Sequence, residues 1–274
     1  AVAVLDTGVD STHPFLAGKV VSEACYSTTD AGQDCQSACP GGVSESTAAG
    51  SAMPPLGGAY GDEFYHGTHV AGIVAGHDAT SSGVARDGNI IAVQVFSWFP
   101  NSGGPGVGGS LTWGSDQIRG MERVYALRNT YKIAAVNMSL GGGREYSPCD
   151  TDSRKAIIDN LRSVGIATVI SSGNNGYPDS TGAPGCISTA VTVGATTKGD
   201  VVATYSNSAS FVDVLALGSS INSSIPGGGF DSWNGTSMAA PHVAGAFAVL
   251  RQAYPTLTVD QIEDALKSTG LPVS

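Results

Sequence analysis

Positive charge is scarce in this sequence. Its 274 residues include 13 lysines and arginines against 23 aspartates and glutamates, which gives a formal net charge of −10. Because surplus negative charge repels phosphate backbones and anionic lipid surfaces, we expect no nucleic-acid partner and no membrane-surface binding. Long apolar runs are missing too. The longest candidate, residues 238–250, is interrupted by Pro241 and His242, so we expect no membrane-spanning helix.

Several chemical signatures are also absent. The glycine-rich run 103–109 lacks a Gly-Lys-Ser/Thr ending and the basic residue that a phosphate needs, so it predicts a substrate-lining loop or a flexible connection. No Gly-x-Ser-x-Gly elbow surrounds Ser237, which disfavours an α/β-hydrolase esterase. The spacing of Cys35 and Cys39 has no second Cys or His pair to match it. Disulfides are therefore favoured over a zinc cluster.

Three of the five cysteines gather in one stretch. Cys25, Cys35 and Cys39 lie among Gly, Ser and Asp residues, which is typical of a locally stapled loop in an oxidising compartment, and one cysteine must be left over. Residues 25–65 have little periodicity, so we interpret them as a surface insertion. The expected organisation is a single domain over residues 1–274, since one large α/β domain suits this length.

Apolar and amphipathic segments alternate along the chain. Buried strands are predicted at residues 1–5, 90–96, 133–138, 166–170, 190–193 and 212–217. Helices are predicted at residues 110–131, 151–164, 236–253 and 258–268. Such alternation implies right-handed crossovers onto a doubly wound, mostly parallel α/β sheet with helices on both faces. Thr258 with Gln261 three residues later is a capping-box pattern that marks the start of the last helix.

Polar segments directly follow three of the predicted strands. They are Asp6-Thr7-Gly8, the Ser-Leu-Gly-Gly segment 139–142 and the Ser-Ser-Gly-Asn-Asn-Gly segment 171–176. Open α/β sheets bind ligands outside the carboxyl ends of their strands. We therefore expect these segments to converge on one edge of the sheet.

Two further segments open helices rich in small residues. His66 begins the run His-Gly-Thr-His-Val-Ala-Gly, and Ser237 lies in Gly-Thr-Ser-Met-Ala-Ala-Pro-His. A lone histidine at such a place is usually structural, and a lone serine is usually a helix cap. With Asp6 they complete an Asp, His, Ser set in that order, which matters more than any one of them.

These three segments resemble the signature segments of subtilisin-like proteases, over nearly the whole chain. The Asp, His, Ser order is the one for which subtilisin is the standard example. The resemblance implies that Ser237 is the nucleophile, that His66 is the general base and that Asp6 orients His66. It also implies that Asn174 and the main-chain N–H of Ser237 form the oxyanion hole.

The resemblance carries further expectations about context. It implies a secreted monomeric peptidase that acts on polypeptides. We also expect an N-terminal propeptide outside this chain, so that the chain is a mature or trimmed product. No cofactor is expected for the chemistry, and calcium is expected only as a structural ion. The loop at residues 77–83 offers Asp78 as its single strong oxygen ligand, which puts the family's tight calcium site in doubt there.

The resemblance also places the primary specificity pocket and one disulfide. The lining of this pocket is expected to be Ser139, Leu140, Gly141, Ser171, Ser172 and Gly173, with Asn175 at the mouth of the pocket. These segments contain no carboxylate, so apolar or aromatic side chains are expected before the scissile bond, with broad selection. By placement, Cys149 pairs with Cys186. Within Cys25, Cys35 and Cys39 the pairing stays open.

Two other functions use the same residues differently. A transpeptidase would pass the same acyl-enzyme to an amine in place of water. A catalytically silent scaffold would keep the fold and lose the reactive groups, whereas Asp6, His66, Asn174 and Ser237 are all present.

Overall fold

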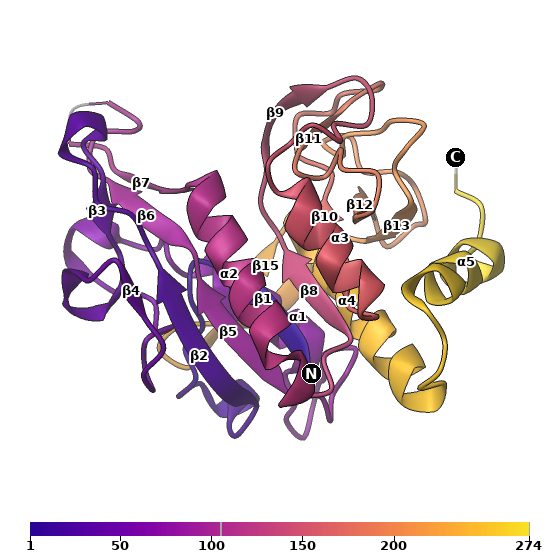
Figure 1. Cartoon of the computed structure of the whole chain (residues 1–274), viewed down its shortest axis with the longest axis horizontal. Coiled ribbons are helices and arrows are strands. Elements are labelled where there is room, and N and C mark those ends of the chain that lie inside the picture. The colour runs from indigo at the N-terminus through magenta and orange to yellow at the C-terminus, as the bar shows by residue number, and fades with distance from the viewer. Residues whose placement is uncertain (105, 274) are drawn as a thin grey trace.

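An eight-stranded sheet forms the centre of the molecule (Figure 1). The structure is a computed structural model, and it describes residues 1–104 and 106–273; Pro105 of the glycine-rich run and Ser274 lie outside the described residues. The strands of the central sheet are β1 (Val2–Asp6), β2 (Val20–Tyr26), β4 (Glu45–Ser46), β5 (Ile90–Gln94), β8 (Ala135–Met138), β10 (Ala167–Ser171), β12 (Val191–Thr196) and β13 (Val214–Leu217). Their order is β13-β12-β10-β8-β1-β5-β2-β4, and all neighbours are parallel except β2 and β4.

Smaller sheets lie around this centre. They are formed by β3 (Gln36–Ser37), β6 (Phe96–Phe99) and β7 (Gly109–Thr112); by β9 (Gly142–Glu145) and β11 (Thr181–Ala183); and by β14 (Ile221–Ile225) and β15 (Gly229–Trp233). Short 3₁₀ turns occur at Pro14–Leu16, Ala31–Gln33, Pro40–Gly42, Gly58–Tyr60 and Leu127–Asn129.

Helices cover both faces of the central sheet, as the sequence predicts. The α-helices are α1 (His66–Ala75), α2 (Gly114–Ala126), α3 (Lys155–Ser163), α4 (Thr236–Ala253) and α5 (Val259–Thr269). Helices α2 and α3 lie on the face nearer the viewer in Figure 1, while α1 and α4 lie behind the sheet. Helix α5 begins with the predicted capping box of Thr258 and Gln261 and packs on α4.

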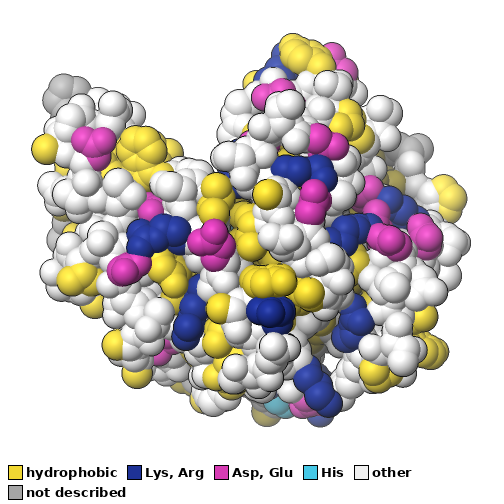
Figure 2. All heavy atoms as spheres, viewed as in Figure 1, with side chains coloured by type: hydrophobic (Ala, Val, Ile, Leu, Met, Phe, Trp, Pro, Cys, Tyr) yellow, Lys and Arg dark blue, Asp and Glu magenta, His cyan; other side chains and the backbone are white. Residues whose placement is uncertain are grey.

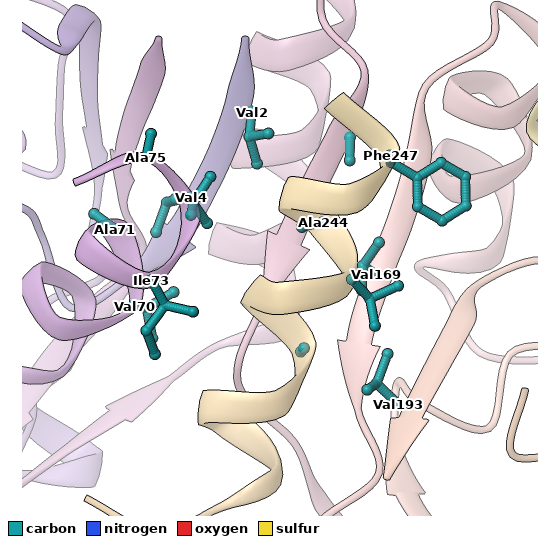
Figure 3. Close-up of a cluster of buried hydrophobic side chains, with 14 of the residues drawn as sticks. Val2, Val4, Val70, Ala71, Ile73, Ala75, Val169, Val193, Ala244 and Phe247 are labelled. Atoms are coloured by element: carbon teal, nitrogen blue, oxygen red, sulfur yellow. The ribbon is translucent and has the colours of Figure 1, made fainter. Parts of the chain in front are cut away.

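The core behind the sheet joins helices α1 and α4 to the central strands (Figure 3). Phe247 of α4 is fully buried in the same cluster as Val169 of β10 and Val193 of β12. Burying a side chain of this size stabilises the fold by about 1.5–3 kcal/mol. Because α4 sits in this core, its first turn is held firmly at the carboxyl edge of the sheet.

Six predicted strands are confirmed, with ends shifted by a few residues. The helix predicted at residues 110–131 is wrong at both ends. It begins at Gly114 because residues 109–112 pair with β6 as strand β7, and it gives way at Leu127 to a 3₁₀ turn. Strand β2 is an unpredicted member of the central sheet. Its Ser22 and Glu23 interrupt the apolar run that would have signalled it.

Residues 25–65 are tied closely to the rest of the molecule. This segment supplies edge strand β4 to the central sheet and β3 to the three-stranded sheet. Phe64, near its end, is fully buried against Trp98 and Tyr60. The segment therefore contributes packed structure beside the edge where the site lies.

Both disulfides join segments near that edge. The predicted Cys149–Cys186 bond is present, and Cys25 pairs with Cys39, which settles the pairing that the sequence left open. Cys35 is the free thiol; it is buried and donates to the carbonyl of Thr28 at 3.2 Å.

Candidate active site

A cleft opens at the carboxyl edge of the central strands, between two raised parts of the surface (Figure 2). Strands β6 and β7 carry one wall, and β9 and β11 carry the other. The cavity at its base has a volume of about 820 Å³. His66, Ser237 and Asn174 all line it, which brings together segments that are far apart in the sequence.

Asp6 and His66 form a direct pair. Asp6 is the last residue of β1 and is fully buried, and its Oδ1 lies 2.8 Å from Nδ1 of His66. The same oxygen accepts a hydrogen bond from the main-chain N–H of Thr7 at 2.7 Å. With Nδ1 engaged by the carboxylate, the His66 ring keeps Nε2 for the cavity, which is the tautomer a general base needs.

The first turn of α1 holds His66 close to β1. A Cβ atom at Gly67 would lie 2.2 Å from the carbonyl oxygen of Gly8, so only glycine permits this approach. The N–H of Gly67 also donates to Thr7 Oγ1 at 2.9 Å. These contacts fix the start of the helix against the end of the strand.

Asp6 also changes the acidity of His66. Burial by itself lowers the pKa of this imidazole, but the charge of Asp6 and its hydrogen bond act in the opposite direction and outweigh burial. The net result is a pKa raised above the ordinary value of 6.5. The ring is therefore a stronger base than a free histidine.

Ser237 is the second residue of α4, and its helix is adapted to hold it. Pro241 lacks an N–H, so the carbonyl of Ser237 receives no bond from the residue four positions on. That carbonyl instead accepts a hydrogen bond from Ser139 Oγ at 2.7 Å, and Ser139 accepts one from Asn137 Nδ2 at 3.0 Å. Ser237 Oγ donates to the carbonyl of Ser139 at 3.4 Å, so the hydroxyl must rotate to reach His66.

Asn174 directs its amide N–H groups at the cavity. Its Oδ1 accepts hydrogen bonds from the N–H of Thr236 at 2.8 Å and from Thr236 Oγ1 at 2.9 Å. Because a main-chain N–H can only donate, the oxygen must face Thr236 and the Nδ2 group is left free. Asn174 and Ser237 thus present two donors on one side of the cavity.

The predicted pocket residues are mostly brought together. Ser139, Leu140, Gly141, Ser171, Gly173 and Asn175 line the cavity with Ala183 of β11. Ser172 lies outside it, because its side chain is fully buried and donates to the carbonyl of Asn207 at 2.9 Å. The described residues of the run 103–109 are not among the lining, and β7 takes that place with Ser110, Leu111 and Thr112.

Sequence reasoning also missed polar residues that shape the cavity. Asn207 is fully buried, and its Oδ1 accepts from the main-chain N–H groups of Asn175 and Tyr177, which holds the segment after β10 in place. Glu63, Gln117 and Arg154 line the cavity itself. The signal for Glu63 was its position three residues before His66, but Gln117 and Arg154 lie in helical patterns without a motif.

His69 has a structural place. Its ring stacks on Trp233 with centroids 4.4 Å apart, and its Nε2 contacts the carbonyl of Asp231 at 3.1 Å. Burial lowers its pKa to about 4, so it is neutral near pH 7. His242 is half-buried on α4, where Nδ1 contacts the carbonyl of Met238.

The loop at residues 77–83 does not fit a calcium ion. Oδ1 of Asp78 already accepts hydrogen bonds from Thr80 and from the N–H of Ser81, so its own loop uses the one carboxylate there. Within the described parts of the chain, no group of three or more His, Cys, Asp or Glu side chains could hold a metal. Each helix among the same residues is too short or too polar to cross a membrane.

Known proteins resemble this chain over most of its length. A model of the subtilase family matches residues 1–271. Subtilisin E of Bacillus subtilis is 35% identical over 274 residues, which cover 98% of this chain and 60% of that protein. Subtilisin of Bacillus pumilus is also 35% identical, over 98% of this chain and 82% of that protein. A solved structure of proteases from Pseudoalteromonas arctica has a TM-score of 0.77 at 29% identity, and the match covers 99% of this chain and 83% of that one.

Proposed function

The chain belongs to the subtilase family, and from this premise we propose that it is a secreted serine endopeptidase that hydrolyses peptide bonds through an acyl-enzyme. The observation that carries the proposal is the Asp6–His66 pair at 2.8 Å, in the cavity that also holds Ser237 and Asn174. A serine hydroxyl is too weak an acid to attack an amide unless a base takes its proton. The Asp6–His66 pair supplies that base. The two disulfides of the chain are typical of an extracellular enzyme.

The reaction proceeds in two halves. Ser237 Oγ attacks the scissile carbonyl while His66 Nε2 takes the hydroxyl proton and then gives it to the leaving amine. Water next attacks the ester carbonyl while His66 takes a proton from the water. The bond to Ser237 Oγ then breaks, the carboxylic acid product leaves, and His66 returns the proton to Ser237 Oγ. Asp6 keeps the imidazole in the required tautomer and stabilises its protonated form in both halves.

The charge that develops on the substrate oxygen needs fixed donors. Nδ2 of Asn174 and the main-chain N–H of Ser237, at the positive end of α4, are suited to that task. Thr236 contributes by holding the Asn174 oxygen, so the amide is already oriented before substrate arrives. No cofactor takes part in these steps.

Substrate binding is proposed along the walls of the cleft. An extended peptide can lie between Ser110–Thr112 and Ser139–Gly141 as an added strand, with the side chain before the scissile bond between residues 139–141 and 171–173. Ser139, Leu140 and Ser171 offer no charge there. Apolar and aromatic side chains are therefore preferred in this primary pocket.

The acid limb of the pH profile tests the base. His66 accepts a proton only when neutral, and Asp6 raises its pKa, so kcat/KM falls as pH drops through a value above 6.5. The measurement is kcat/KM from about pH 5 to pH 9 with a peptide that has no ionising side chain. A limb with its midpoint below 6.5 would contradict the proposed coupling.

Asn175 tests the primary pocket. It is exposed and lines the cavity, so Asn175→Glu places a negative charge near the bound side chain. The ratio of kcat/KM for Lys over Phe substrates should rise about tenfold at low salt and less at high salt, because salt screens exposed charges. An unchanged ratio would exclude Asn175 from the pocket, and a parent preference for Lys or Arg would overturn the pocket assignment.

One experiment separates hydrolysis from the alternatives. A phosphonate reagent with mass spectrometry should label Ser237, and a scaffold without catalysis would stay unlabelled. A peptide library incubated with the same protein should yield cleaved fragments. Ligated fragments in place of hydrolysed ones would favour the transpeptidase.

A further inference from the structure

Two polar side chains that take no part in the proposed reaction, Gln117 and Arg154, line the same cavity, and we call them the polar floor. Gln117, in the first turns of α2, is 3% exposed, and Arg154, which directly precedes α3, has a side chain that is 14% exposed. Both line the cavity together with Leu140 and Thr112. A buried amide and a largely buried guanidinium need polar partners, so their hydrogen bonds decide what they can offer to a ligand.

Within the polar floor, Arg154 donates hydrogen bonds to Asp152 and Gln117, and some of its N–H groups have no partner among these bonds. Oδ1 of Asp152 accepts hydrogen bonds from Nε of Arg154 at 2.8 Å and from the main-chain N–H of Arg154 at 2.9 Å. Oδ2 of Asp152 accepts from Nη2 of Arg154 at 2.5 Å. Nη1 of Arg154 donates to Oε1 of Gln117 at 2.8 Å. The guanidinium has five N–H groups, and three are engaged, so about two remain.

The amide of Gln117 adds to this set. Its Nε2 reaches Thr112 Oγ1 only at 3.5 Å, which leaves its N–H groups weakly bound. Its oxygen already accepts from Arg154, so the N–H groups are the less engaged side of this amide. The cavity's own carboxylate, Glu63, is held on the β7 wall, where its Oε2 accepts from the N–H of Ser110 at 3.2 Å.

Apolar side chains also contribute to the lining of this cavity. Phe96, Leu111 and Leu140 line the same cavity. A substrate side chain that matches this lining has methylene groups to contact the apolar residues and a hydrogen-bond acceptor to reach the polar floor. Glutamate does both, and its charge makes the hydrogen bonds to Arg154 stronger than those of a neutral amide.

We propose that Gln117 and Arg154 form a subsite that selects a glutamate side chain on the part of the substrate before the scissile bond. The inference rests on the proposed peptidase function. It adds a charge preference away from the primary pocket, which stays apolar. Arg154 is a specificity-determining residue, and Asp152 moderates it, because the carboxylate neutralises part of the guanidinium charge.

The test uses peptides that share one aromatic residue before the scissile bond. A single Glu, Gln, Leu or Lys is placed in turn at each of about four upstream positions, and kcat/KM is measured for each peptide. The parent should cleave the Glu peptide about tenfold faster than the Leu peptide at one of these positions, with Gln between them and Lys lowest. Equal rates for Glu and Leu at every position would overturn the proposal.

Two variants break the ion pair of Arg154 and Asp152, and they are expected to change the Glu/Leu ratio of kcat/KM in opposite directions. Arg154→Met removes the donors and should bring the Glu/Leu ratio to about one, while Asp152→Asn removes the competing charge and should raise that ratio. A merely structural role for the pair would lower the ratio in both variants. A fall in both, or no fall in Arg154→Met, overturns the proposal.

Arg119→Met is the matched control. Arg119 lies on the same helix as Gln117, pairs with Glu45 and does not line the cavity, so its Glu/Leu ratio should equal that of the parent. Turnover of the Leu peptide, together with Ser237 labelling, reports the peptidase function separately. If no peptide is cleaved and no label forms, the proposed function fails; if the Leu peptide is cleaved without a Glu preference, only the subsite fails.

Discussion

Ser237→Ala should lower kcat by about 10⁶-fold, which is the size of loss known for the corresponding serine of subtilisin. The variant removes one hydroxyl at the start of α4 and no core volume. Ser139 Oγ donates to the main-chain carbonyl of Ser237, which the substitution does not change, so this hydrogen bond persists. Thermal unfolding should therefore be nearly unchanged while hydrolysis disappears, and the two measurements on one sample check both halves of the expectation.

Ser232→Ala provides the comparison for this variant. Ser232 is an exposed residue of β15, five positions before Ser237, and it does not line the cavity. Its kcat should stay within about twofold of the parent value. Hydrolysis by Ser237→Ala within about tenfold of the parent would refute Ser237 as the nucleophile.

Asp6→Asn should lower kcat by about 10⁴-fold, the size of effect known when the triad carboxylate of a serine protease becomes an amide. The change keeps the shape of a fully buried side chain. An amide N–H in place of the carboxylate oxygen favours the wrong tautomer of His66, so Nε2 no longer accepts the serine proton. The substitution also removes the attraction that raises the pKa of His66, leaving burial to lower it.

Residual hydrolysis by Asp6→Asn should therefore have an acid limb at lower pH than the parent. Labelling of Ser237 by the phosphonate should slow to a similar degree as turnover. Asp78→Asn, an exposed change in the loop 77–83, is the control and should leave both rates unaltered. Parent-like turnover by Asp6→Asn would remove Asp6 from the mechanism.

The residues proposed for catalysis could be identified from sequence because each lies in a fixed local frame. Asp6 ends a buried strand, and His66 and Ser237 open helices of small residues. Adjacent parallel strands β1, β8 and β10 carry their following segments to one edge. Local pattern and sheet topology were enough to predict that these segments meet.

The floor residues could not be predicted in this way. Gln117 and Arg154 come from separate helices, and their contact depends on how α2 and α3 pack on the sheet. Nothing within a few residues of either marks it as a cavity residue. Ser172 shows the converse error: it sits in a motif, yet alternation along the chain turns its side chain into the protein toward Asn207.

The place of α4 in the core also governs when the enzyme becomes active. This helix packs against β8, β10, β12, β13 and α1, so these strands and α1 must be in place before it can dock. Contacts between residues so distant in sequence form late and slowly in folding. During synthesis Asp6 leaves the ribosome well before Ser237, and the nucleophile meets its base only as the core closes. Proteolytic competence and completed folding are then one event, so a half-folded chain cannot cut its neighbours.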